Sequence, residues 1–414
     1  MAQALDRLSA GEPIEAVPPE LLEEFSLPVL AVALEWIHRP LPGDDLDGLN
    51  SGTSPAHRRL ALGELYEHQL ELAAAYRRHR DRAKGRCYRV DDRLRRLARE
   101  LLPFRLTAAQ KRVVGEMVRD LTSPYPMLRL LQGDVGSGKT AVAALLMLVA
   151  AENGVQSSLL APTELLAEQH AASLREFFDG RLSVCLLTAK GIEEGASSTV
   201  SVQEASIVVG THALLNANLD LPRLGLVIID EQHRFGVTQR QTMVEKGSEV
   251  DLLVMSATPI PRTLALAGYG DLDLSLLDEL PPGRRPVETL VLPKKRRKEV
   301  YARLREDLRL GRQGYVVFPS IRPSENGKWV SLEGMAPKIE AGLEGVSVER
   351  FHGQLSWEER EEIMRRFRAG DVQLLLATTV VEVGVDVPTA TAMVIEGAER
   401  FGLAQLHQLR GRVG

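Results

Sequence analysis

The sequence predicts an α/β fold in which two parallel-sheet domains follow a mainly helical N-terminal region. Short apolar runs alternate with helical segments from Leu106 onward, a pattern typical of a parallel sheet covered by helices on both faces. A Pro- and Gly-rich stretch, ELPPGRRP (279–286), interrupts this alternation once, and the pattern then resumes. A length of 414 residues suits two or three domains. We therefore expect a helical region at 1–102, a first α/β domain at 103–282 and a second at 283–414.

The helical region contains the strongest helical periodicity before the first sheet. Residues 55–102 are rich in good helix formers and predict one or two long helices, with Gly85 as a break. Between Pro55 and Arg105 there are 14 Lys and Arg residues against 7 Asp and Glu residues. This excess is compatible with a solvated helix face or with a surface that contacts phosphates, and charge alone favours the solvated face.

Apolar runs of strand length divide into two groups around the Pro- and Gly-rich stretch. The first group comprises MLRLLQ (127–132), SSLLAP (157–162), SVCLL (183–187), ASIVVG (205–210), LGLVIID (224–230) and LLVMSAT (252–258). The second group comprises ETLVL (288–292), GYVVFPS (314–320), VSVERFHG (346–353), VQLLLATT (372–379) and TAMVIEG (391–397). Each group is long enough to form a separate sheet.

Composition excludes several other classes of protein. The net charge of −5 does not itself indicate a nucleic-acid partner. The N-terminal residues lack the apolar segment of a signal peptide, and no apolar run is long enough to cross a bilayer. The two cysteines, Cys87 and Cys185, have neither metal-ligand spacing nor the number needed for a disulfide framework. We therefore expect a protein of a reducing, cytoplasmic compartment that makes no contact with membranes.

GDVGSGKT (133–140) is the most informative local motif. It fits the pattern G-x-x-x-x-G-K-[ST] and lies between an apolar run and an Ala-rich helical segment, the context of a phosphate-binding loop. In such a loop, backbone N–H groups and the following helix N-terminus bind the phosphates of a nucleotide. The lysine reaches the terminal phosphates, and the hydroxyl residue can hold Mg²⁺. The nucleotide-binding residues predicted from this motif are Gly133, Asp134, Val135, Gly136, Ser137, Gly138, Lys139 and Thr140.

Two further apolar runs of the first domain end in polar residues. Asp230 and Glu231 follow LVII; the first is predicted to hold Mg²⁺ and the second to orient and deprotonate the attacking water. Ser256 and Thr258 follow LLVM, and their hydroxyls could hydrogen-bond to His233. Each pair alone is also compatible with an ordinary strand end, and the phosphate-binding motif upstream favours the catalytic interpretation.

The second domain carries two candidate segments. Thr378 and Thr379 follow the run LLLA, and Asp386 lies in the loop after them, where hydroxyls and amides suit contacts to a sugar-phosphate backbone. A plain connecting loop is the competing interpretation. The final segment, HQLRGRVG, presents Arg410 and Arg412 between glycines. An arginine from a facing domain can neutralise the charge that develops during phosphoryl transfer, so this segment is a candidate for that role.

The order of the motifs resembles that of superfamily 2 helicases, and their detail resembles the RecG family of bacterial ATP-dependent DNA helicases, which remodel branched DNA. The motifs are GDVGSGKT, APTELLAEQH, GTHALL, DEQHRFGVTQR, SATPIPRTLAL, ATTVVEVGVDVP and AERFGLAQLHQLRGRVG. GDLDLSLLDELPPGRRPVET (270–289) and GRQGYVVFPSIRPSE (311–325) favour RecG over its relatives. The resemblance covers roughly residues 27–414 and is highly specific.

The resemblance implies two RecA-like domains that bind ATP and Mg²⁺ between them and move along duplex DNA. It implies roles for Lys139, Asp230, Glu231 and Arg412 in catalysis, and for Gln110 in contacting adenine. The residues that it implies for coupling are Gln232, His233, Ser256, Thr258 and Asp386. The residues that it implies for DNA binding are Thr163, Thr211, His212, Thr378 and Thr379. It also implies a branched double-stranded DNA partner, and it makes single-strand DNA-binding protein a candidate partner and a monomer the expected state.

The resemblance further implies segments that the sequence does not contain. The last motif of the family continues with an arginine after Gly414, and the family has an N-terminal wedge and a C-terminal helical hairpin. We therefore expect a truncated RecG-like motor. For such a chain, an ATP- and DNA-binding module with little turnover is the alternative to an active helicase, and DNA stimulation of ATP turnover distinguishes the two.

Overall fold

The computed structural model divides into two compact units. It describes residues 15–80, 83–188, 191–193, 201–215, 220–230, 250–257, 272–281, 287–323, 330–378, 387 and 389–413. Residues 15–80 lie in the first unit, and nearly all described residues from Ala83 onward lie in the second. No described helix combines the length and the apolar character that crossing a bilayer requires.

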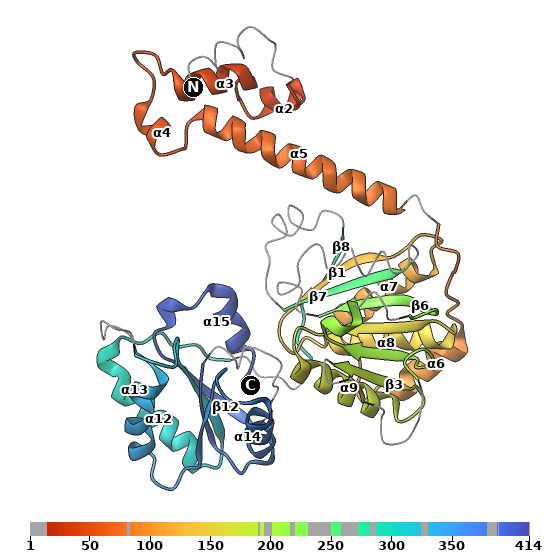
Figure 1. Ribbon diagram of the computed structural model, residues 1–414, viewed down its shortest axis with the longest axis vertical. Coiled ribbons are helices and arrows are strands. Elements are labelled where there is room, and N and C mark those ends of the chain that lie inside the picture. Colours follow the sequence, from red (N-terminus) through yellow and green to blue (C-terminus); the bar gives the residue numbers. More distant parts are fainter. Residues whose placement is uncertain are drawn as a thin grey trace. The chain divides into compact units, whose positions relative to one another are not determined.

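The first unit is helical. Its helices are α2 (Pro19–Glu24), α3 (Leu30–His38), α4 (Leu46–Asn50) and α5 (Pro55–Arg80). Helix α3 packs against α5, the long helix seen in Figure 1. At the start of α5, the buried Arg59 forms an ion pair with Glu15, whose carboxylate also accepts hydrogen bonds from the backbone N–H groups of Val17 and Leu30. This pair therefore ties the segments before α2 and α3 to α5.

The prediction of one or two long helices over residues 55–102 is confirmed, and the structure has two helices there. They are α5 and α6 (Asp92–Leu101), and Gly85 lies in the non-helical stretch between them. Asp91 caps α6 by accepting a hydrogen bond from the backbone N–H of Leu94. Helix α7 (Ala108–Thr122) follows and leads into the first sheet.

Among the described residues, the first sheet has eight strands in the order β4-β3-β5-β2-β6-β7-β1-β8, and all neighbours are parallel except the edge pair β3 and β4. The strands are β1 (Leu128–Gly133), β2 (Gln156–Leu160), β3 (Val184–Thr188), β4 (Gly191–Glu193), β5 (Ile207–Gly210), β6 (Leu224–Ile229), β7 (Asp251–Ser256) and β8 (Asp273–Leu277). All six predicted runs form strands. The short strands β4 and β8 were not predicted.

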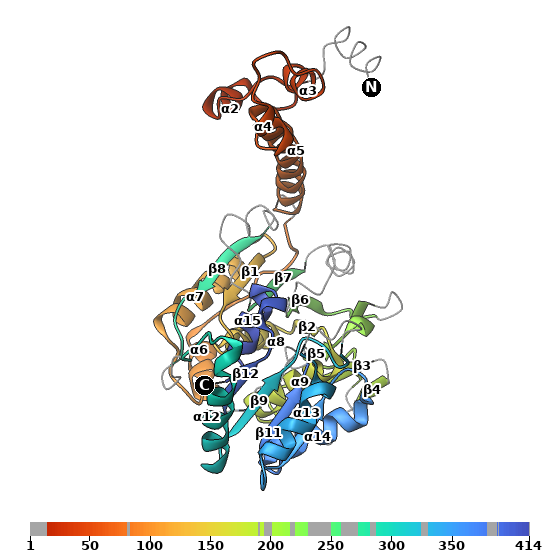
Figure 2. The same cartoon turned by 90° about the vertical axis from the view of Figure 1, so that its left-hand side faces the viewer.

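Helices α6, α7, α8 (Lys139–Glu152) and α9 (Glu164–Phe178) share one core with this sheet. Alternate residues of β6, Leu226 and Ile228, belong to that core, while Val227 and Ile229 are buried on the opposite face. A strand that is buried on both faces requires apolar residues at every position, and LGLVII satisfies this requirement. Figures 1 and 2 show these helices and strands from two directions.

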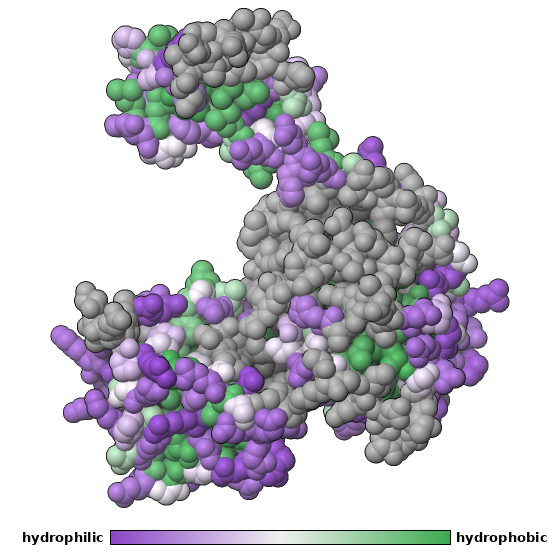
Figure 3. Space-filling model, viewed as in Figure 1, coloured by the Kyte–Doolittle hydropathy of each residue, from purple (hydrophilic) through white to green (hydrophobic). Residues whose placement is uncertain are grey.

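The second sheet has four parallel strands in the order β10-β11-β9-β12. The strands are β9 (Gln313–Val317), β10 (Val348–Phe351), β11 (Leu374–Ala377) and β12 (Ala390–Ile395). The helices are α12 (Arg297–Arg309), α13 (Leu332–Gly342), α14 (Trp357–Ala369) and α15 (Leu403–Arg410). Helices α12 and α13 share a core with one face, and α14 and α15 share a core with the other. The surface over α12 and α14 is mainly hydrophilic in Figure 3.

The prediction of a strand at ETLVL (288–292) is wrong. These residues are irregular in structure, and the side chain of Val291 is 94% exposed. A strand needs a neighbour for its backbone hydrogen bonds, and β12 occupies the place next to β9. The remaining four runs of this group form β9, β10, β11 and β12, so the two-sheet α/β fold is confirmed.

A buried ion pair fixes the segment between α5 and α6 to the first sheet. The Lys84 ammonium donates to Oδ1 of Asp251 at 2.8 Å, and both side chains are completely buried. The same oxygen accepts the backbone N–H of Met127 at 2.7 Å, and Lys84 also donates to the backbone carbonyl of Asp120. Burial raises the pKa of the Asp251 carboxyl, and the neighbouring ammonium opposes that change. The pair therefore joins residues 167 positions apart in the chain.

Candidate functional site

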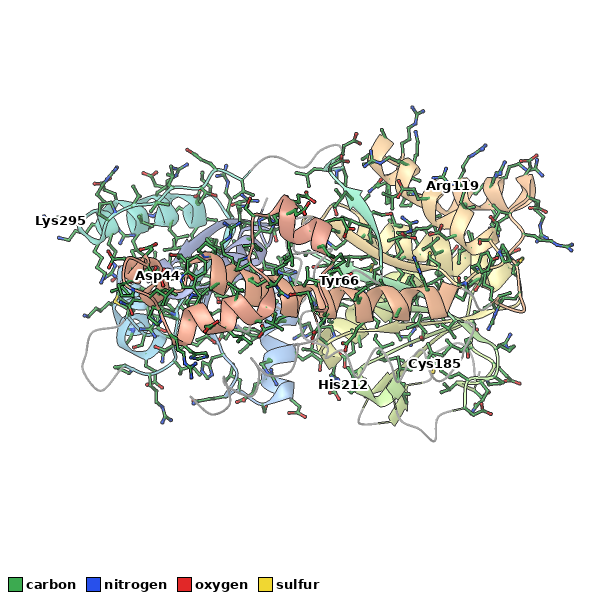
Figure 4. The ribbon with its side chains drawn as sticks, turned by 90° about the horizontal axis from the view of Figure 1, so that it is seen from above. Asp44, Tyr66, Arg119, Cys185, His212 and Lys295 are labelled. Carbon is green, nitrogen blue, oxygen red and sulfur yellow. The ribbon has the colours of Figure 1, made fainter. Side chains whose placement is uncertain are left out.

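The predicted site residues of the first domain lie at one edge of the first sheet. Parallel strands end at a common edge, and β5, β2, β6, β7 and β1 are consecutive neighbours. Thr211 and His212 follow β5, Thr163 follows β2, Asp230 follows β6, Ser256 ends β7 and Gly133 ends β1. The residues predicted to contact DNA therefore follow two adjacent strands, and those predicted for the nucleotide and its metal (Asp230, Gly133) and for coupling (Ser256) follow the next three. Figure 4 labels His212.

The phosphate-binding motif forms a turn that only glycine accommodates easily. Gly136 and Gly138 have φ angles of 77° and 88°, in the left-handed region. Gly138 is the N-cap of α8, so Lys139 opens the helix. The ammonium of Lys139 donates hydrogen bonds to the backbone carbonyls of Gly133 at 2.8 Å and Asp134 at 3.0 Å. These bonds hold the lysine inside the turn, next to the helix N-terminus that attracts anions.

Gln110 braces this turn from α7. Its Nε2 donates to the backbone carbonyl of Ser137 at 2.9 Å, and its Oε1 accepts the N–H of Thr107 at 3.0 Å in a capping box. A Cβ atom at Gly138 would lie 2.2 Å from Nε2 of Gln110. Both ends of the amide thus contact the protein. The adenine contact of Gln110 stays a prediction, and the bracing contact was not predicted.

The donor atoms near the turn suit a magnesium-bound triphosphate. The hydroxyl of Ser137 is fully buried and has no hydrogen-bond partner among the described residues, as expected for a group that would face a phosphate. Thr140 and Asp230 supply the hard oxygen donors that Mg²⁺ prefers, and Mg²⁺ usually completes its shell with waters and phosphates. In the described part of the chain, no group of three or more His, Cys, Asp or Glu residues could hold a metal ion.

Asp230 has a neighbour that the sequence interpretation missed. Nε2 of His170, on α9, lies 2.8 Å from Oδ2 of Asp230, and the two side chains are 9% and 11% exposed. The ionised carboxylate can only accept, so Nε2 carries the hydrogen. A single histidine in a helix gives no signal by itself. The available signal was its position at the end of APTELLAEQH, two helical turns after Thr163.

Helix α15 contacts the phosphate-binding turn directly. Nε2 of His407 lies 2.6 Å from Oδ1 of Asp134, and Nη2 of Arg410 lies 3.3 Å from Nδ1 of His407. An arginine can only donate, so Nδ1 accepts and Nε2 donates to the carboxylate. The three side chains form a hydrogen-bonded series that connects the arginine segment to the turn. His407 was not predicted as a site residue.

Gly411 fits against the turn because it lacks a side chain. A Cβ atom there would lie 2.4 Å from Cβ of Val135. We expect Gly411→Ala to reduce ATP turnover about tenfold or more, because the added methyl would separate the arginine segment from the turn and small misplacements of catalytic groups are costly. Steady-state ATPase measurements test this. Gly115→Ala, in α7, is the matched control because a Cβ there meets nothing within 4 Å. Equal activities for the two variants would contradict the expectation.

Several predicted residues lie outside the described part of the chain. They are Glu231, Gln232, His233, Thr258, Thr379 and Asp386. The predicted hydrogen bond from Ser256 or Thr258 to His233 therefore stays a prediction. Thr378 is described; it is buried directly after β11, and its N–H donates to the carbonyl of Phe351. Arg412 is half-buried, just after α15.

The two sheets and the phosphate-binding turn define a P-loop fold of the helicase class. Two family models support this class: "DEAD/DEAH box helicase" matches residues 107–266, and "Helicase conserved C-terminal domain" matches residues 297–414. The first match includes strands β1 to β7 and the second includes β9 to β12, whereas β8 of the first sheet lies between the two matches. The predicted domain limits at 102/103 and 282/283 stay predictions.

The chain is similar to members of the RecG family over its whole length. It is 45% identical over 423 residues to the ATP-dependent DNA helicase RecG of Escherichia coli O157:H7, with 100% of this chain and 60% of the relative covered. It is 44% identical to RecG of Synechocystis, with 97% of this chain and 48% of the relative covered. The chain thus spans about half to three-fifths of the length of these curated relatives.

Solved structures agree with the family and the fold. A structure of RecG bound to a three-way DNA junction is 40% identical, with a TM-score of 0.76, and the match covers 97% of this chain and 53% of that one. A variant of yeast Dbp5 bound to RNA and ADP BeF3 is 20% identical, with a TM-score of 0.54 over 75% of this chain and 84% of that one. The second similarity concerns the fold alone and confirms two RecA-like domains.

Proposed function

We propose that the chain is the motor of an ATP-dependent DNA helicase that translocates on double-stranded DNA and remodels branched DNA, such as replication forks and Holliday junctions, in recombination and repair. The observation that carries the proposal is that the residues predicted to bind the nucleotide and those predicted to bind DNA follow neighbouring strands at one sheet edge. Similarity to RecG over the whole chain supports it. The relatives are bacterial, and we place the activity in the bacterial cytoplasm.

In this proposal the phosphate-binding turn holds ATP. The backbone N–H groups of the turn and the ammonium of Lys139 bind the phosphates, and Thr140 and Asp230 hold Mg²⁺, which would neutralise phosphate charge. Glu231 orients the attacking water and accepts its proton. Arg412 neutralises the charge that develops on the transferred phosphoryl group. Donation by His407 to Asp134 supports this arrangement because it fixes the end of α15 on the turn.

In this proposal, small polar residues at the ends of strands bind DNA. The residues are Thr163, Thr211, His212, Thr378 and Thr379. Short hydroxyl, imidazole and backbone groups suit contacts to phosphate and sugar, which position a duplex without reading its sequence. We therefore propose recognition by shape and phosphate, with Gln232, His233, Ser256, Thr258 and Asp386 linking the DNA contacts to hydrolysis. A partnership with single-strand DNA-binding protein and a monomeric state stay predictions.

Steady-state ATPase assays with and without forked duplex DNA test the proposal. We expect forked DNA to stimulate turnover, and Glu231→Gln to remove the stimulated activity while ATP still binds. The Glu231→Gln preparation also serves as the blank for contaminating ATPases. ATP binding without DNA-stimulated turnover would contradict the motor proposal and support the alternative, an ATP- and DNA-binding module with little turnover.

A further inference from the structure

We propose that His170 is a positioning residue that links the DNA side of the sheet edge to the magnesium-holding carboxylate of Asp230. The hydrogen bond at 2.8 Å between their side chains is almost completely buried, so water does not compete with it. Donation by Nε2 to Oδ2 fixes the rotation of the carboxylate. The ligand group would then face the metal in one orientation, as outer-shell partners of metal ligands generally ensure.

The position of His170 also connects Asp230 to residues that are predicted to contact DNA. It lies on α9, whose N-cap is Thr163: the side chain of Thr163 accepts a hydrogen bond from the N–H of Leu166. Helix α9 packs against β3 and β5, and β5 leads into Thr211 and His212. Strand β2, which precedes Thr163, is hydrogen-bonded to β6, which precedes Asp230.

Helix α9 therefore reaches both the residues predicted to contact DNA and the residues predicted to bind the nucleotide and its metal. A DNA contact at the start of α9 would displace or stabilise the helix, and two turns later His170 would pass that change to the carboxylate of Asp230. The nucleotide site would respond through a change in the orientation of one metal ligand, the carboxylate of Asp230, without movement of the sheet. The coupling rests on the whole proposed function, whereas the positioning of Asp230 by His170 rests only on the Mg²⁺ role proposed for that carboxylate.

The test compares His170→Leu with His170→Gln. Leucine removes the donor at similar size, and glutamine can place an N–H near the position of Nε2. Both changes are combined with Glu231→Gln, so that binding of a fluorescent ATP analogue is measured at equilibrium over a series of Mg²⁺ concentrations. We expect His170→Leu to raise the Mg²⁺ concentration for half-maximal binding about tenfold or more, and His170→Gln to restore most of the loss.

A control in the same helix separates positioning from helix stability. Arg175→Leu removes hydrogen bonds from α9 to the carbonyl of Val184 but leaves Asp230 untouched. Thermal unfolding shows that each variant folds. An equal Mg²⁺ dependence for His170→Leu and Arg175→Leu, or no rescue by His170→Gln, would overturn the inference.

The coupling is tested by DNA stimulation in chains with the native Glu231. We expect His170→Leu to reduce the ratio of DNA-stimulated to basal ATP turnover, measured at saturating Mg²⁺, whereas Arg175→Leu keeps that ratio. An unchanged ratio would overturn the coupling. An unmodified chain that DNA does not stimulate would overturn the proposed function and, with it, the coupling; the Mg²⁺ titration would still decide the positioning role.

Discussion

Replacement of Lys139 by alanine is expected to reduce ATP turnover by at least about a hundredfold, because it removes the one ammonium that the turn holds at the N-terminus of α8. Its Nζ lies 2.8 Å and 3.0 Å from the carbonyls of Gly133 and Asp134, inside the phosphate-binding turn. Loss of a single preorganised group that stabilises transition-state charge typically costs a factor of 10² to 10³. Steady-state ATPase with forked DNA measures the loss.

Lys111→Ala is the matched control for this variant. Lys111 is an exposed residue of α7, so its loss removes the same charge from the protein without touching the turn. We expect its turnover to stay close to that of the unmodified chain. Thermal unfolding of both variants establishes that the change at the turn leaves the fold intact. Turnover within a few-fold of the unmodified value for Lys139→Ala would refute its predicted role.

Lys84→Met is expected to lower the free energy of unfolding of the second unit by about 3–5 kcal/mol. The substitution leaves the completely buried carboxylate of Asp251 without its cation, and an uncompensated buried charge costs about this much. Methionine keeps the apolar stem, so the loss reports the charge rather than a cavity. Urea denaturation monitored by far-ultraviolet circular dichroism measures this change in the free energy of unfolding.

A double variant separates the ion pair from general damage. Asp251→Asn removes the charge but keeps an oxygen that can accept the N–H of Met127. We expect Lys84→Met combined with Asp251→Asn to recover much of the lost stability, since neutralising both partners removes the unpaired charge. Lys295, labelled in Figure 4, is exposed in a short 3-10 turn (Lys294–Arg296) just before α12, and Lys295→Met should change stability by less than about 0.5 kcal/mol. A Lys84→Met protein as stable as this control would exclude the expected effect.

Much of the fold could be predicted because the signals were local. Six buried strands and the phosphate-binding motif are each contained in a few consecutive residues, and the parallel arrangement follows from their alternation with helices. The run at 288–292 was misassigned because strand formation depends on a neighbouring strand, which the run itself does not reveal. Strand β8 was missed for the complementary reason: its residues DLSLL are only partly apolar, and pairing with β1 establishes the strand.

The site was predictable where chemistry depends on a continuous motif and not where it depends on packing. Lys139, Thr140 and Asp230 follow from motif and strand end. His170 and His407 meet their carboxylates across 60 and 273 positions of sequence, respectively, and no local pattern encodes such a contact. The bracing role of Gln110 was missed because its amide meets the carbonyl of Ser137 only once α7 has packed beside the turn.

The strand order also determines how much of the chain must be synthesised before the sheet around the phosphate-binding turn can form. Strand β1 ends at Gly133, yet its two partners are β7, which ends at Ser256, and β8, which ends at Leu277. A ribosome adding about 5–20 residues per second leaves this apolar strand unpaired for roughly ten seconds. During that interval α8 has no finished sheet to cover. The apolar residues of β1 and α8 therefore stay without their final cover until residues 251–277 have been synthesised.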